Sequence, residues 1–73
     1  MRTKLKIKRM QKGIKSYQAS EQLNMSRAYY SYIENGRKNP SLETWMQIQE
    51  LYHIPNEEMW EIIIENKEIQ EWN

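Results

Sequence analysis

Apolar side chains recur along this chain every three or four residues, which is the spacing of one face of an α-helix. The clearest repeat is formed by Leu42, Trp45, Ile48 and Tyr52, and all four are expected in the core of a helix over residues 42–52. Shorter repeats predict helices at 3–12, 16–23 and 27–35, and another helix starts after Pro55. The sequence shows no strand pattern. It therefore predicts the all-α class, a compact bundle of four to five short helices.

Residues that start and end helices stand at the boundaries of these segments. Thr3, Ser26 and Ser41 are expected to cap helix N-termini, and Gly13 is expected to end the first helix. Asn24 lies where the chain must turn sharply, and asparagine tolerates the left-handed conformation that such turns need. The first helix has the least regular apolar stripe, formed by Leu5, Ile7, Met10 and Ile14.

Residues 16–34, SYQASEQLNMSRAYYSYIE, are the most informative stretch. They predict two short helices joined by a tight turn, with Met25, Tyr30 and Ile33 on the inner face of the second helix. The opposite face of that helix is polar and is flanked by cations. This arrangement is typical of a helix-turn-helix, in which one exposed helix enters the DNA major groove.

Charge is strongly segregated along the chain, although the formal net charge is only +1. Up to residue 38 there are ten cations, Arg2 among them, and two glutamates, which gives +8. From residue 39 onward one lysine stands against eight glutamates, which gives −7. A basic half suits a polyanion such as DNA, and an acidic half is expected to point away from it.

Composition excludes several classes of protein. At 73 residues the chain is one small domain, and its lack of cysteine excludes disulfides and thiol chemistry. With a single histidine, neither a metal nor another cofactor is expected. The glutamates are spread along helix faces rather than gathered around a pocket, so no catalytic residue and no enzymatic activity is expected. There is no signal-peptide pattern and no apolar run of membrane-spanning length, so we expect a cytoplasmic protein.

Several spaced motifs together resemble the Cro/C1-type helix-turn-helix regulators, the XRE family of phage and mobile-element repressors. The motifs are residues 13–14 (GI), 23–26 (LNMS), 33–37 (IENGR) and 40–42 (PSL), and the resemblance extends from Leu5 to about Trp60. It implies a lambda repressor-like DNA-binding domain. Tyr30 departs from the family in replacing a β-branched core residue, so its hydroxyl needs a partner. Lys8 stands where an apolar residue is common, which predicts looser packing of the first helix.

The resemblance also implies roles for individual residues. Arg9 and Glu34 match an ion pair that joins the first and third helices. Arg27 matches a position that reads base edges, and its guanidinium can pair with guanine. The expected base contacts are Ser26, Arg27, Ala28, Tyr29, Ser31 and Tyr32. The expected phosphate contacts are Lys15, Ser16, Tyr17, Arg37 and Lys38, with Lys15 taking the place of the family's glutamine contact.

Beyond the family core, at 1–60, residues 61–73 predict a helical C-terminal extension. Its apolar positions exceed what one face can bury, and exposed apolar side chains rimmed by charge favour a partner surface. We expect a homodimer that places two recognition helices about one DNA turn apart. Packing of this helix on its own domain is the alternative. The expected interface residues are Trp60, Ile63, Ile64, Ile69 and Trp72.

Taken together, these features predict a sequence-specific transcriptional regulator, a repressor that binds an inverted-repeat operator in double-stranded DNA. Besides a second copy of the chain, an antagonist protein is an expected partner, and no membrane is. Two alternatives stay open. One is the antitoxin of a toxin–antitoxin pair that autoregulates its operon, and the other is a protein-binding module or anti-repressor that uses the fold without DNA.

Overall fold

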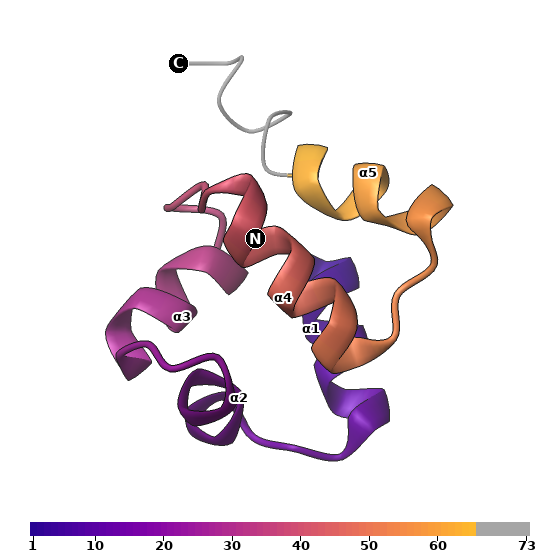
Figure 1. The fold of residues 1–73 in the computed structure, drawn as a ribbon. Helices are drawn as coiled ribbons and strands as arrows, with labels where there is room; N and C mark the ends of the chain where they lie inside the picture. The colour runs from indigo at the N-terminus through magenta and orange to yellow at the C-terminus, as the bar shows by residue number, and fades with distance from the viewer. Residues whose placement is uncertain (66–73) are drawn as a thin grey trace.

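The computed structural model of the chain describes residues 1–65, which form five α-helices and no strand. In chain order the helices are α1 (Thr3–Lys12), α2 (Ser16–Gln22), α3 (Arg27–Glu34), α4 (Leu42–Tyr52) and α5 (Asn56–Ile64). Helices α2 and α3 lie together on one side of α4, and α5 lies on the other side (Figure 1). The predicted all-α class and the predicted number of helices are confirmed.

One core joins the helices. Leu5 of α1, Tyr30 and Ile33 of α3, Ile48 of α4 and Ile62 of α5 are each at most 1% exposed. Burial of apolar side chains such as these contributes roughly 1.5–3 kcal/mol each, so this shared cluster fixes α3 relative to three other helices. The face of α3 that is turned away from the cluster is thereby held in a defined place.

Most of the predicted helix boundaries are present. The Ser26 and Ser41 hydroxyls each accept a hydrogen bond from the backbone N–H three residues later, as N-caps do. Gly13 ends α1 with φ +82°, and Asn24 turns the chain with φ +59°. Thr3, however, is the first residue of α1 rather than its cap, because the cap position belongs to Arg2.

Three side chains that were expected in the core are on the surface. Leu42 is 74% exposed, because it lies six residues before Ile48, which is about 120° short of two full helical turns. Ile7 and Met10 are 46% and 61% exposed, since neither shares the helix face of the buried Leu5. The apolar stripe of α1 is therefore narrower than predicted.

Lys8, which stands where an apolar residue is common, forms an ion pair. Its ammonium nitrogen lies 2.7 Å from a carboxylate oxygen of Glu58, so the side chain links α1 to α5 across the surface. The ion pair gives this polar side chain a partner, and the looser packing of α1 stays a prediction.

Candidate nucleic-acid interface

The turn between α2 and α3 fixes the angle at which α3 is presented. After α2 ends, the Met25 N–H donates to the Ser20 carbonyl at 3.0 Å, and Asn24 takes the left-handed conformation. Ala19, Ser20 and Leu23 are buried beneath the turn. A short α2 is therefore anchored from below, and the two helices form a helix-turn-helix.

The N-terminal end of α3 is open to solvent. Ser26, Arg27 and Ala28 are exposed, and Tyr32, one turn further on, is 41% exposed. The Tyr29 N–H donates to the Ser26 hydroxyl at 3.1 Å, which caps the helix. These residues lie on the surface at the positions where base contacts were predicted.

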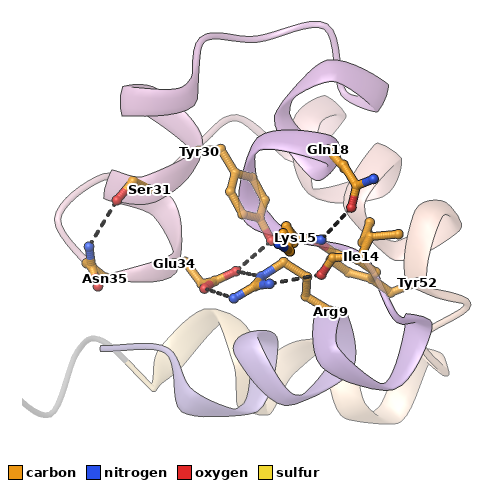
Figure 2. Close-up of polar contacts among 9 residues, drawn as sticks. All are labelled: Arg9, Ile14, Lys15, Gln18, Tyr30, Ser31, Glu34, Asn35 and Tyr52. Carbon is orange, nitrogen blue, oxygen red and sulfur yellow. Dashed lines mark hydrogen bonds and ion pairs between the residues drawn. The ribbon is translucent and has the colours of Figure 1, made fainter.

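Two of the predicted base contacts are less accessible. Tyr29 is half-buried and packs against the core cluster, and Ser31 is half-buried on the same helix. The Ser31 hydroxyl also accepts a hydrogen bond from the Asn35 amide at 3.2 Å (Figure 2). Both side chains therefore already have structural contacts within the free protein.

The predicted phosphate contacts flank this surface on both sides. Lys15, Ser16 and Tyr17 are exposed at the start of α2, where the Lys15 N–H donates to the Gln18 side chain at 2.8 Å (Figure 2). Arg37 and Lys38 are exposed just after α3. Their backbone N–H groups donate to the Tyr32 carbonyl at 2.8 and 3.2 Å, so the loop that carries them is held against α3.

A contact that the sequence analysis missed joins these two regions. The Arg27 guanidinium carbon lies over the Tyr17 ring, 5.0 Å from its centroid. This distance is within the range of a cation–π interaction. The signal in the sequence was an aromatic residue at the second position of α2 together with an arginine at the first position of α3.

The C-terminal end of α3 is fixed by a buried polar network (Figure 2). The predicted ion pair is present: the Arg9 guanidinium donates to the two Glu34 carboxylate oxygens at 2.9 and 3.2 Å. Arg9 also donates to the Ile14 carbonyl at 2.9 Å. The hydrogen bond to Glu34 raises the pKa of Arg9 above its ordinary value. This pair joins α1, α3 and the loop that leads into α2.

Two tyrosine hydroxyls complete the network. The Tyr30 hydroxyl, whose need for a partner the sequence indicated, donates to Glu34 at 2.8 Å and is hydrogen-bonded to the Tyr52 hydroxyl. Burial raises the pKa of Tyr52 to about 12, and burial also raises the pKa of Tyr30 well above its ordinary value. Both tyrosines therefore stay neutral at physiological pH and link α3 to the end of α4.

Arg2 departs most clearly from its expected place. It was counted among the cations of the basic half, yet its side chain is fully buried and lies over the Trp45 ring, 4.9 Å from the centroid. Its guanidinium donates to the carbonyls of Ile33 at 2.6 Å and Lys38 at 3.0 Å, and to the Asn39 side chain at 2.9 Å. Burial lowers its pKa. Arg2 thus holds the end of α3 and the loop after it, and it offers no charge to a ligand.

The C-terminal residues predicted to form an interface are only partly described. Trp60 is 64% exposed on α5, whereas Ile63 and Ile64 are half-buried, with Ile63 packed against the core cluster. Ile69 and Trp72 lie outside the described residues. Helix α5 carries Glu57 and Glu58 in its first turn. It continues without a break past residue 60, where the family core was predicted to end.

The comparisons with known proteins agree with this geometry. The helix-turn-helix family model matches residues 5–58, which is most of the chain. A relative, the ImmF control region 10 kDa protein of Bacillus phage phi105, is 42% identical over 50 residues. The aligned region is 68% of this chain and 56% of that relative, so the chain spans little more than half of the relative's length. No solved structure matches the chain significantly.

The chain therefore belongs to the helix-turn-helix family, and the predicted resemblance to Cro/C1-type regulators of phage type is confirmed. Between residues 1 and 65 no group of three or more acidic or histidine side chains is placed to hold a metal ion. None of the five described helices has the length and apolar character that crossing a membrane requires.

Proposed function

We propose that this protein is a sequence-specific DNA-binding regulator of transcription and that α3 is the helix that enters the major groove. The observation that carries the proposal is the contrast along α3, whose N-terminal end is exposed between cations while its C-terminal end is locked into the core. Membership of the helix-turn-helix family supports it. A helix about 10–12 Å across with its side chains fits a major groove about 12 Å wide.

Base edges are read, in this proposal, from the first turns of α3. Arg27 can donate two parallel hydrogen bonds to guanine O6 and N7, which is worth roughly 1–3 kcal/mol of discrimination. Ser26 and Tyr32 supply hydroxyls, and Ala28 allows close approach or contacts a thymine methyl. Tyr29 and Ser31 are half-buried, so their contacts with DNA are limited to what remains accessible at the edge of the helix.

Phosphates are bound on either side of the groove. Lys15, Ser16 and Tyr17 at the start of α2 contact one strand, and Arg37 and Lys38 after α3 contact the other. Such contacts set the position of the protein on the duplex and make binding sensitive to salt. Arg2 takes no part in this, because its charge is buried.

We further propose that the protein acts as a repressor at an inverted-repeat operator and that it binds as a homodimer through its C-terminal helix. The relative's description as a control region protein supports a regulatory role. The exposed Trp60 on α5 supports a protein contact there. The division into a 1–60 domain and a 61–73 extension stays a prediction.

The experiment that tests the function is selection of bound sequences from random duplex DNA. The proposal predicts an enriched inverted repeat with half-site centres about 10 base pairs apart, or a multiple of that spacing. The Arg27→Ala variant should lose the preference for one guanine in each half-site. Retention without any shared motif, or no retention at moderate salt, would contradict the proposal.

A second candidate function is favoured by the surface of α5. This helix carries Glu57, Glu58 and Glu61 beside a Trp60 that is 64% exposed, a combination suited to a basic protein partner. An antitoxin that holds a toxin with this helix and autoregulates its operon with α3 would use both surfaces. The antitoxin function predicts that a basic protein co-purifies with the wild type and no longer does so with the Trp60→Ser variant. Loss of DNA binding in that variant would not support this function.

A further inference from the structure

The contact between Arg27 and Tyr17 bears on how the DNA-reading surface is prepared. Tyr17 stands in the first turn of α2 and is 39% exposed, and Arg27 is the first residue of α3. The guanidinium carbon lies over the aromatic ring at 5.0 Å from the centroid. The turn between the helices brings the two residues together although they are ten positions apart.

Among the described residues of the free protein, the Arg27 guanidinium has no electrostatic partner other than the Tyr17 ring. It sits at the positive end of the α3 dipole, where a cation is disfavoured, and no acidic residue occupies the first turn. Within residues 1–65 the ion pairs are Lys8–Glu58 and Arg9–Glu34, and no side-chain hydrogen bond uses the Arg27 guanidinium. The negative face of the Tyr17 ring is therefore the group that attracts this charge.

A stacked guanidinium keeps its donors available. The N–H groups of arginine lie in the plane of the guanidinium and point outward from its edge. Stacking occupies the face of that plane and restricts a flexible side chain, while the edge remains open to a planar acceptor pair. An arginine held in this way loses less freedom when it pairs with a base.

We propose that the Tyr17 ring is a positioning element for base readout, which aligns the Arg27 guanidinium for a guanine before DNA arrives. This inference rests on the proposed function and adds to it a determinant of specificity on α2. Tyr17 was expected only to contact phosphate, which its hydroxyl can still do. The ring and the hydroxyl thus have separate roles that substitution can separate.

The test compares Tyr17→Phe, which keeps the ring, with Tyr17→Leu, which removes it, on the selected duplex and on single-base variants of it. Tyr17→Leu should weaken binding about two- to fivefold, the range of an exposed cation–π contact. It should reduce discrimination by a similar factor at the same base pair that Arg27→Ala affects. Tyr17→Phe should keep the pattern of base discrimination, and any loss of its affinity should be uniform across sequences, as a phosphate contact requires.

The free protein provides an independent readout. In NMR spectra the Arg27 side-chain protons should show an upfield ring-current shift in the wild type and in Tyr17→Phe, and this shift should disappear in Tyr17→Leu. Absence of the shift in the wild type would overturn the inference, and so would a Tyr17→Leu variant that keeps the full discrimination of the wild type. If the wild type selects no sequence at all, the proposed function itself fails, which is a distinguishable result.

Discussion

The two ends of helix α3 are built in opposite ways. At the N-terminal end Ser26, Arg27 and Ala28 are exposed, and the Arg27 charge faces an aromatic ring rather than a carboxylate. At the C-terminal end Ile33 and Glu34 are buried. Arg2 donates there to the Ile33 carbonyl, and Arg9 and Tyr30 donate to the Glu34 carboxylate. One helix is thus anchored at one end and available at the other.

The difference explains how so small a domain can present a rigid surface. A side chain that reads a base must be placed precisely, yet it must also be free of internal partners. The buried end of α3 supplies the precision through contacts with α1 and α4, and the exposed end is left with few contacts of its own. Substitutions at the two ends should therefore separate stability from DNA binding.

The largest contrast in stability is expected between Ile33→Ala and Arg27→Ala. Ile33 is fully buried, so its truncation should lower the free energy of unfolding by about 3 kcal/mol through lost burial and a cavity. Arg27→Ala should change it by less than about 0.5 kcal/mol. Urea unfolding followed by circular dichroism measures both. If Ile33→Ala does not fold, Ile33→Val can replace it and should lower the free energy of unfolding by roughly 1 kcal/mol. Similar losses of stability for the substitutions at Ile33 and at Arg27 would refute the contrast.

Arg2→Met tests whether the buried arginine is a structural element. The variant leaves the Lys38 carbonyl and the Asn39 side chain without the Arg2 donor, and it takes one donor from the Ile33 carbonyl, which keeps the Gly36 N–H. This loss should cost about 2 kcal/mol of stability. Lys4→Met is a matched control, because Lys4 is exposed on the same helix end. Under conditions where the protein is folded, Arg2→Met should leave the salt dependence of DNA binding unchanged. A smaller salt slope would show that Arg2 contacts phosphate.

The two ion pairs of the described chain offer a matched comparison. Glu34→Gln removes a carboxylate whose side chain is only 9% exposed and should cost about 1.5–2 kcal/mol. Glu58→Gln breaks the pair with Lys8. Because the Glu58 side chain is 43% exposed, this substitution should cost less than about 0.5 kcal/mol. Thermal unfolding of both variants measures the difference. Equal effects would mean that the burial of the Glu34 network contributes little.

Alkaline pH should affect the buried end through its tyrosines. Their pKa values are raised in the folded protein, to about 12 for Tyr52, so the unfolded chain loses these protons first. Stability is therefore complete below about pH 10, the ordinary pKa of tyrosine, and should fall as pH rises toward 12. Tyr52→Phe should make the loss of stability at pH 11 smaller by about 1 kcal/mol. Tyr32→Phe, a substitution at an exposed tyrosine, should leave it unchanged.

Much of this architecture could be predicted from the sequence, because helix signals are local. The caps Ser26 and Ser41, the left-handed Gly13 and Asn24, and the motifs around Gly36 define the elements and the family. The prediction that Leu42 lies in the core was wrong, because this residue does not share the helix face of the buried Ile48.

The sites that sequence reasoning missed depend on tertiary placement. Arg2 is a cation near the chain start, and only the folded structure brings it beneath the end of α3 and over Trp45. The stacking of Arg27 on Tyr17 depends in the same way on the angle between α2 and α3. Counting charges along the sequence cannot distinguish a buried arginine from one that faces a ligand.

Contact of DNA with the exposed end of α3 and its flanks can be mapped by NMR of the backbone amides during titration with the selected duplex. We expect the largest shift changes on residues 15–17, 26–32 and 37–38, and little change at Glu57, Glu58 and Glu61 on α5. Changes concentrated on α5, or none at α3 while the duplex is bound, would contradict this expectation.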